Sequence, residues 1–578
     1  LLSLVFDFLQ VIRTSAFVTL PSGQFCRLTV FSFELSWKIF DFMNIENQYD
    51  YIIVGAGAAG CVLANRLSSD QTQTVLLLEA GTASRSWQLR MPMAALDGLS
   101  QSTKFSWNNW SEAEPRLKLR RLFVPGGKVI GGSSSINGMV HVRGNSKEFD
   151  AWAKHGCHGW DFESVLPYFK KSESYQGQGD GLRGTEGPLI VHKTSPTNPL
   201  DQAFIQSGEQ AGYGITEDFN GHQQEGFGSY DHTIDKGQRV STATAYLNPI
   251  SYRSNLIVKS QTRVKRVQLD NLKATAVEYE DSIGSHKVFA NREIILSGGA
   301  IWSPHLLQQS GIGDADQLRA AGIKVHHHLA SVGNGLQNHI DVVLQYACKE
   351  PVSILNMTRP WNRAIQGMYW FTKFGGYYST CPFVAGAFIK SSDTQPYPDI
   401  QVIFTPLATE PTTQRPKTSH GFQAHIGLQK YTSKGSVTPK CNQSEQPPKI
   451  RFNLLEQQDD RTRLVQAIRH FREVFKQPAF SKFCGEELLP GPSIVSDSDL
   501  SRWLESHAGC AHHVSASCRM GPADNQNSVV DPECRVIGIE GLRIVDASIM
   551  PEIVNSNTHA TVVMLAEKAS DHILGKTN

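Results

Sequence analysis

The most regular hydrophobic pattern begins near residue 49. Tyr49–Val54 is a short apolar run rich in β-branched residues, which predicts a buried parallel strand. A helical pattern follows over Cys61–Leu67, and a second apolar run at Thr74–Leu78 predicts another strand. This order of strand, turn, helix and strand is typical of the start of a dinucleotide-binding domain.

Later in the chain the pattern changes. Short apolar runs at Asp399–Phe404, Gln423–Gln429 and Gly435–Thr438 predict strands, and Asp460–Gln477 carries apolar residues at helical spacing. No internal repeat or low-complexity tract interrupts them. We therefore expect a second region with its own strands and helices.

Glycines punctuate the first strand–helix unit as Gly-Ala-Gly-Ala-Ala-Gly. Gly55 permits a tight turn, Gly57 lets the backbone approach a pyrophosphate, and Gly60 allows close packing of helix on strand. Glu79 ends the second strand, near the spacing of about 20 residues expected for an acid that binds a ribose hydroxyl. These features predict dinucleotide binding without choosing between NAD and FAD. A second Gly/Ser-rich loop, Pro125–Gly144, is either a surface turn or a loop packed against a cofactor.

Composition narrows the function classes. Lys and Arg number 55 against 54 Asp and Glu, so no basic excess supports nucleic-acid binding. The hydrophobic share of 40% excludes wholesale disorder. The 10 cysteines are too sparse in this length for a disulfide scaffold. None forms a Cys-x-x-Cys pair, which argues against a zinc ribbon or a thioredoxin-type site.

The first residues stand apart from this pattern. Residues 1–42 are apolar and aromatic, but charged residues interrupt them before any run reaches the roughly 20 residues of a spanning helix. We interpret 1–48 as an N-terminal extension that need not belong to the native protein, with translation starting at Met43. A cytoplasmic location follows, with peripheral membrane contact as an option. A mitochondrial location applies if residues 1–42 are a transit peptide.

Several motifs in order carry a resemblance to a known family. They are VGAGAAG (Val54–Gly60), LLLEAG (Leu76–Gly81), KVIGGSSSINGM (Lys128–Met139), GGAIWSPHLLQQSGIG (Gly298–Gly313), VGNGLQNH (Val332–His339) and GLRIVDASIMP (Gly541–Pro551). The chain resembles the glucose–methanol–choline (GMC) family of FAD-dependent alcohol oxidoreductases, above all its choline-oxidising members. The similarity extends from Tyr49 to Leu574.

The resemblance implies an α/β fold. A discontinuous Rossmann-like FAD-binding domain is expected at 49–340, with some substrate-domain insertions, and at 501–574, where the catalytic segment also lies. A substrate-binding domain at 341–500 is expected to be built on an antiparallel sheet backed by helices. The implied FAD contacts are Gly55, Gly57, Gly60, Glu79, Gly131, Gly132, Asn137, Gly138, Val264 and Asp546. Some relatives bind FAD covalently through a His where this chain has Ile136, so we predict non-covalent FAD.

Two histidines are the expected catalytic residues. Alcohol oxidation by a flavin needs a base with a suitable pKa near the hydroxyl, and His is the usual choice. The resemblance places this base at His513, and it places a partner, which the family supplies as Asn or His, at His559. His326–His328 are neighbours in one strand and point to opposite faces, so we interpret them as structural and predict no metal site.

The implied reaction is oxidation of a primary alcohol, with choline favoured, to the aldehyde. A His removes the proton, a hydride passes to flavin N5, and electrons leave to a quinone-like acceptor. Asp341 stands where choline-oxidising relatives have Glu, as a candidate for binding the ammonium group. Candidates for aromatic contacts, in a stretch that is more often core or cap than cage, are Trp361, Tyr369, Trp370, Tyr377 and Tyr378. A dehydrogenase or oxidase for another alcohol and a hydroxynitrile-lyase-type enzyme remain alternatives; the oligomeric state is open.

Overall fold

The computed structural model describes residues 48–410 and 415–576. Residues 1–47 of the N-terminal extension, which include the predicted start at Met43, therefore lie outside the described residues. The first predicted unit is present: β1 (Gln48–Val54), α3 (Ala58–Leu67) and β2 (Val75–Leu78) follow one another as the pattern indicates. The helix begins three residues earlier than the apolar pattern suggested, because Ala58, Ala59 and Gly60 form its first turn.

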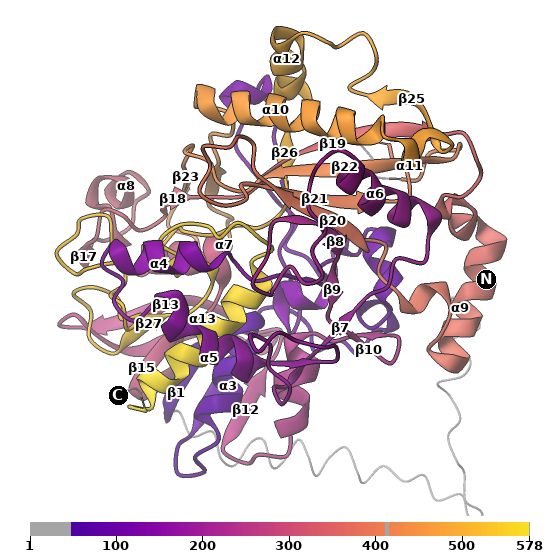
Figure 1. Ribbon diagram of the computed structural model, residues 1–578. Coiled ribbons are helices and arrows are strands. Elements are labelled where there is room, and N and C mark those ends of the chain that lie inside the picture. The colour runs from indigo at the N-terminus through magenta and orange to yellow at the C-terminus, as the bar shows by residue number, and fades with distance from the viewer. Residues whose placement is uncertain (1–47, 411–414, 577–578) are drawn as a thin grey trace, which may run out of the picture. The chain divides into compact units, whose positions relative to one another are not determined.

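The first large sheet has the order β12-β2-β1-β15-β14-β13, and β27 also pairs with β15 (Figure 1). The remaining bounds are β12 (Leu256–Lys259), β13 (Arg263–Asp270), β14 (Lys273–Glu280), β15 (Ser285–Leu296) and β27 (Leu542–Ile544). Strands β12, β2, β1, β15 and β27 pair in parallel, whereas β13 and β14 form an antiparallel extension. Its parallel part joins segments from both ends of the chain.

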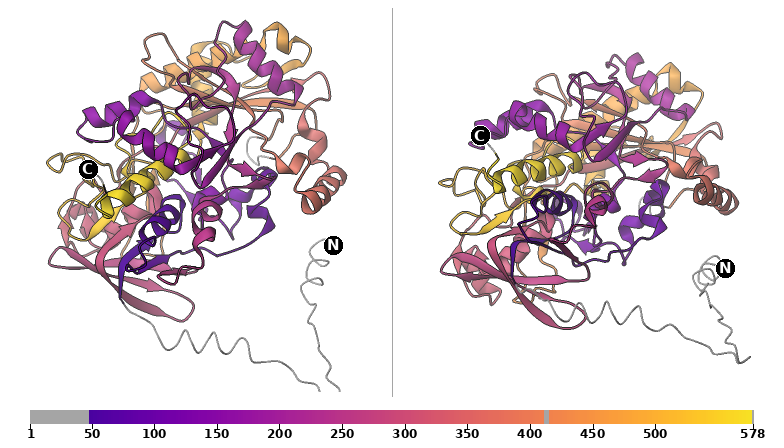
Figure 2. Two further views of the ribbon diagram at one scale, coloured as in Figure 1. Left: turned by 60° about the horizontal axis from the view of Figure 1, so that its bottom comes forward. Right: turned by 90° about the horizontal axis from the view of Figure 1, so that it is seen from below.

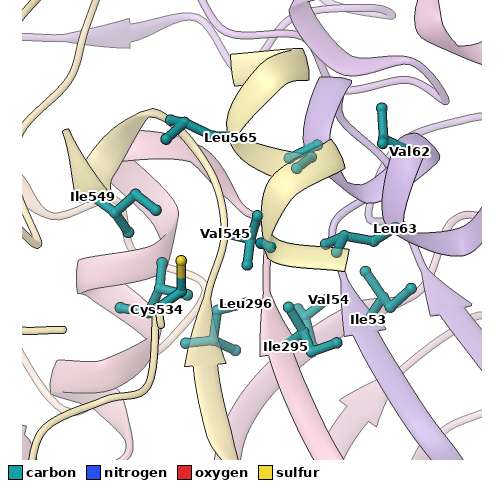
Figure 3. Close-up of a cluster of buried hydrophobic side chains, with 14 of the residues drawn as sticks. Ile53, Val54, Val62, Leu63, Ile295, Leu296, Cys534, Val545, Ile549 and Leu565 are labelled. Carbon is teal, nitrogen blue, oxygen red and sulfur yellow. The ribbon is translucent and has the colours of Figure 1, made fainter. Parts of the chain in front are cut away.

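The core of this region lies between the parallel strands and two helices, α3 and α13 (His559–Ile573). Figure 3 shows Leu63 of α3 and Leu565 of α13 above Ile53 and Leu296 of the sheet. All four side chains are at most 1% exposed, so the helices are held by close apolar packing. The C-terminal helix thereby completes the domain that β1 begins.

The second large sheet is antiparallel, in the order β25-β19-β22-β21-β20-β8, with β26 beside β19. Its strands are β8 (Gly226–Ser229), β19 (Ile340–Cys348), β20 (Ala385–Ile389), β21 (Ile400–Thr405), β22 (Gly421–Leu428), β25 (Cys484–Leu489) and β26 (Gly509–Cys510). Helices α6 (Pro199–Gln210) and α10 (Gln458–Phe475) pack against it (Figures 1 and 2).

These two regions confirm the predicted α/β fold with a discontinuous first domain and an antiparallel sheet backed by helices. The predicted strand Gly435–Thr438 forms as β23, but it pairs with β18 (Asn334–Leu336) and β24 (Lys449–Arg451) in a separate small sheet. Within the described ranges, no helix combines the length and the apolar character needed to cross a membrane.

Candidate active site

A cavity of about 580 Å³ brings the predicted site residues together. Its wall includes both glycine-rich loops, residues of β19, β21 and β22, and the segments that precede α13. All predicted site residues except Gly60 and Gly131 line it. The volume lies in the range that holds small molecules and cofactors.

The first glycine loop is shaped by close backbone contacts. Gly55 has φ +104°, and a Cβ there would lie 2.5 Å from Ser297 O. A Cβ at Gly60 would lie 1.9 Å from Gly55 O, so this glycine lets α3 approach β1 and does not line the cavity. Gly57 faces the cavity and gives α3 no side-chain cap, which leaves first-turn N–H groups for an anion.

The second glycine loop lies against the first. A Cβ at Gly132 would come within 2.7 Å of Gly57 Cα, whereas Gly131, with φ +91°, turns the chain behind the wall. Asn137 and Gly138 line the cavity further along. The Asn137 side-chain oxygen accepts a hydrogen bond of 2.7 Å from Arg239, a buried guanidinium without a carboxylate partner among the described residues.

Two acidic residues hold backbone segments of the cavity wall: Glu79 the first glycine loop, and Asp546 the start of helix α7 (Gly299–Gln309). Glu79 accepts hydrogen bonds from the backbone N–H groups of Ala56 (2.8 Å) and Gly81 (2.7 Å), and burial raises the pKa of its carboxyl to about 7. Asp546 accepts from Gly299 N (2.9 Å) and Ser303 Oγ (2.6 Å). Both carboxyl groups and Val264 line the cavity. Two apposed glycine loops, an uncapped helix N-terminus and an acid beside them fit the pyrophosphate and ribose of FAD.

His513 lies in a hydrogen-bond chain that is fixed at both ends. At one end, His339 Nε2 lies 2.8 Å from the backbone oxygen of Val554, which only accepts, so this nitrogen carries the proton. His339 Nδ1 is then the acceptor for His513 Nδ1, at 2.9 Å. His513 Nε2 is left without a proton, 3.0 Å from Asn557 Nδ2.

The other end of the chain fixes the amide of Asn557. Tyr230 donates its hydroxyl proton to Val402 O (2.8 Å), and Gln401 Nε2 donates to the Tyr230 oxygen (3.3 Å) and to Asn557 Oδ1 (2.9 Å). Asn557 therefore presents its NH₂ group to His513. Burial lowers the pKa of His513 to about 3, so the imidazole is neutral at pH 7. The arrangement holds a neutral imidazole with its basic nitrogen at the cavity.

His559 is the first residue of α13 and lines the cavity, as an active-site residue would. The hydrogen bond to His513 Nε2 comes from Asn557, two residues earlier, which the sequence reasoning did not single out. The role of His559 as the partner of His513 therefore stays a prediction. His559 Nε2 is buried and has no hydrogen-bond partner among the described residues.

Asp341 is held by a second hydrogen-bond chain. Its Oδ2 lies 2.9 Å from His425 Nδ1, and His425 Nε2 lies 3.0 Å from Gln423 Nε2. The Gln423 oxygen accepts from the backbone N–H of Thr409 (3.1 Å), so its NH₂ group faces His425. That donor favours a neutral imidazole that donates through Nδ1. Burial lowers the pKa of His425, but the carboxylate of Asp341 outweighs it and the net direction is upward.

The expected aromatic contacts are absent from the cavity wall. None of Trp361, Tyr369, Trp370, Tyr377 and Tyr378 lines it. Trp370 and Tyr378 are instead buried with Met91, Met93 and Ala94 in a separate cluster. Of the two readings of these residues, core or cage, the structure supports the core: α9 (Pro360–Lys373) packs beside the cavity wall and does not form it. Phe383, Trp107 and Trp302 are the aromatic residues that do line the cavity.

The other histidines singled out in the sequence lie away from the cavity wall. His327 and His328 form β17, His327 Nε2 lies 3.1 Å from Ile537 O, and His328 Nδ1 accepts from Ala315 N. In the parts of the chain that the structure describes, no group of three or more potential ligands is placed to hold a metal ion.

The fold and the cavity define a dinucleotide-binding oxidoreductase with a neutral histidine in its cavity wall. The chain belongs to the GMC oxidoreductase family, whose N-terminal part matches residues 49–341 and whose C-terminal part matches residues 432–566. The chain is accordingly an FAD-dependent oxidoreductase that acts on CH–OH groups.

Individual relatives cover nearly the whole described chain. It is 41% identical over 537 residues to the mitochondrial choline dehydrogenase of Mus musculus, covering 92% of this chain and 90% of the relative. It is 42% identical over 535 residues to the oxygen-dependent choline dehydrogenase of Photobacterium profundum, covering 92% and 94%. Among solved structures, pyridoxine 4-oxidase from Mesorbium loti matches with TM-score 0.83 at 29% identity, covering 92% and 100%.

Proposed function

We propose that this protein oxidises a primary alcohol to its aldehyde, with choline as the leading substrate. The observation that carries the reaction is the neutral imidazole of His513, whose unprotonated Nε2 lies at the cavity beside the Asn557 amide. The imidazole accepts the hydroxyl proton, while the amide of Asn557 holds the substrate oxygen. FAD, when bound, supplies the acceptor for the hydride.

Asp341 supports choline as the substrate. Its carboxylate lines the cavity that His513 lines, and its negative charge is uncancelled at any pH at which His425 is neutral. A fixed carboxylate attracts a quaternary ammonium group in a partly dry cavity. The relatives named choline dehydrogenase agree with this proposal. A second candidate, an uncharged alcohol, is favoured by the absence of the expected aromatic residues from the wall.

Several finer points complete the proposal. FAD is bound non-covalently, because Ile136 lines the cavity with an unreactive hydrocarbon side chain.

Electrons pass to a quinone-like acceptor, and the protein contacts a membrane peripherally. We propose a cytoplasmic location, or a mitochondrial one if residues 1–42 serve as a transit peptide. Relatives from mitochondria and from bacteria are compatible with either.

The test is anaerobic mixing of the purified yellow protein with choline and with a panel of primary alcohols, while flavin absorbance is followed. Bleaching by choline supports the proposal. Bleaching only by other alcohols would keep the reaction and replace the substrate. An oxidised flavin throughout, together with cleavage of a cyanohydrin, would establish the lyase alternative. Acid precipitation tests the flavin linkage, since non-covalent FAD stays in the supernatant.

A further inference from the structure

Helix α9 is apolar on two opposite faces. One face anchors it, because Trp370 is 1% exposed and donates a hydrogen bond of 2.8 Å to Gly237 O. The other face carries Trp361, Ile365 and Met368, which follow one another at helical spacing. Trp361 is 78% exposed and Met368 64%. In Figures 1 and 2, α9 lies at the edge of the described part of the chain.

Neighbouring side chains enlarge this surface. Tyr369, Phe371 and Phe374 are also exposed, and the Trp87 ring lies 5.5 Å from that of Phe371. We call this surface the α9 patch: Trp87, Trp361, Ile365, Met368, Tyr369, Phe371 and Phe374. Single exposed apolar residues are ordinary on a protein surface, whereas several on one helix and its neighbours indicate a site of interaction.

The segment that carries α9 has only basic charges. Residues 351–380 contain no Asp or Glu, but they contain the exposed residues Arg359, Arg363 and Lys373. Arg90 adds a further cation, 5.5 Å from the Phe374 ring. A helix with Trp, Ile and Met on one face and basic residues at its flanks is typical of segments that lie in the interface of an anionic bilayer.

We propose that the α9 patch docks this protein on an anionic lipid surface, with the apolar side chains at the level of the acyl chains. The inference rests on the peripheral membrane contact of the proposed function and assigns it to a surface. Trp370, on the opposite face of α9, packs on η2 (Pro92–Asp97), and Ala95 of η2 lines the cavity. Docking therefore holds the cavity wall close to the bilayer, where a lipid-soluble acceptor is concentrated.

The experiment is co-sedimentation of the full-length, FAD-loaded protein with phosphatidylcholine vesicles, with and without about a quarter of phosphatidylglycerol. The unmodified protein is expected to bind the anionic vesicles and to release them as salt is raised. The variant W361Q/I365Q/M368Q is expected to lose about tenfold or more in vesicle affinity. The matched control Y252Q/I283Q/V495Q removes three other exposed apolar side chains and is expected to bind unchanged.

Activity with choline and a water-soluble dye needs no membrane, so it separates this inference from the proposed function. Both variants are expected to keep that activity. Unchanged vesicle binding by W361Q/I365Q/M368Q would overturn the inference, as would an equal loss in the control. Failure of the unmodified protein to bind vesicles, together with a dimer in sedimentation velocity that the first variant abolishes, would reassign the α9 patch to self-association.

Discussion

At the nucleotide end of the cavity the wall is mostly backbone, and at the catalytic end it is mostly side chains. Gly55, Gly57 and Gly132 shape the first end within two short segments of sequence. The second end depends on His513, Asn557 and residues of β19, β21 and β22. A site built from backbone atoms requires glycine at fixed spacings, so it can be predicted from the sequence. A side-chain site requires tertiary folding to decide which groups meet.

The largest effect is expected at the catalytic end, from His513→Ala. Loss of the general base should slow flavin reduction by the alcohol by about 10²- to 10⁴-fold while FAD stays bound. Stopped-flow absorbance under anaerobic conditions measures the rate. His512→Ala changes the neighbouring histidine and should cost less than about tenfold. Near-full activity of the His513 variant would remove this residue from the mechanism.

At the nucleotide end, Gly60→Ala should reduce FAD content about tenfold or more, because the added Cβ would lie 1.9 Å from Gly55 O and push α3 from β1. The ratio of flavin to protein absorbance measures occupancy. Gly367→Ala is the control, since a Cβ there meets nothing within 4 Å. Equal FAD content in the two variants would contradict the packing role of Gly60.

Charge at the catalytic end is tested by Asp341→Asn. The preference for choline over its uncharged isostere 3,3-dimethylbutan-1-ol should fall by about tenfold or more, because one carboxylate charge near the ammonium is removed. The ratio of the two kcat/KM values is the readout. A parallel loss for both substrates would show that Asp341 supports the structure of the site and does not select the cation.

The two candidate partners of His513 are separated by Asn557→Ala and His559→Ala. Removing the Asn557 amide should slow flavin reduction about tenfold, because a hydrogen bond to a developing charge is lost. His559→Ala should change this rate less, because His559 is not paired with His513. A larger loss of rate in His559→Ala than in Asn557→Ala would identify His559 as the partner of His513.

The smallest expected effect is on pH dependence. Asp341 raises the pKa of His425 above its usual value near 6.5. Below that pKa the imidazolium cancels the Asp341 charge, and above it the carboxylate acts alone. The choline preference should therefore increase with pH through the pKa of His425 and then level off. His425→Gln should flatten the profile by a few-fold, and an unchanged profile would assign the titration elsewhere.

The contrast also explains which expectations succeeded. The Gly55–Gly60 loop and the strands around it were predicted because glycine spacing and apolar runs are local properties. The aromatic residues of α9 were left between core and cavity, since composition alone does not say which face of a helix meets a cavity. His559 was predicted as the partner of His513 and Asn557 was not considered, because the sequence does not show that Asn557 lies within hydrogen-bond distance of His513 in the fold.

The sequence by itself determined the first glycine loop and its flanking strands, because these depend on residue types at short, regular spacings. The full fold class and the choice of His513 came from motifs shared with a family. Only the tertiary structure decided the tautomer of His513, the partnership with Asn557 and the charge state around Asp341. Those properties depend on donors and acceptors brought from distant strands, such as Gln401, Gln423 and Val554. Hydrogen bonds are directional and short, so only folding establishes which of these groups meet.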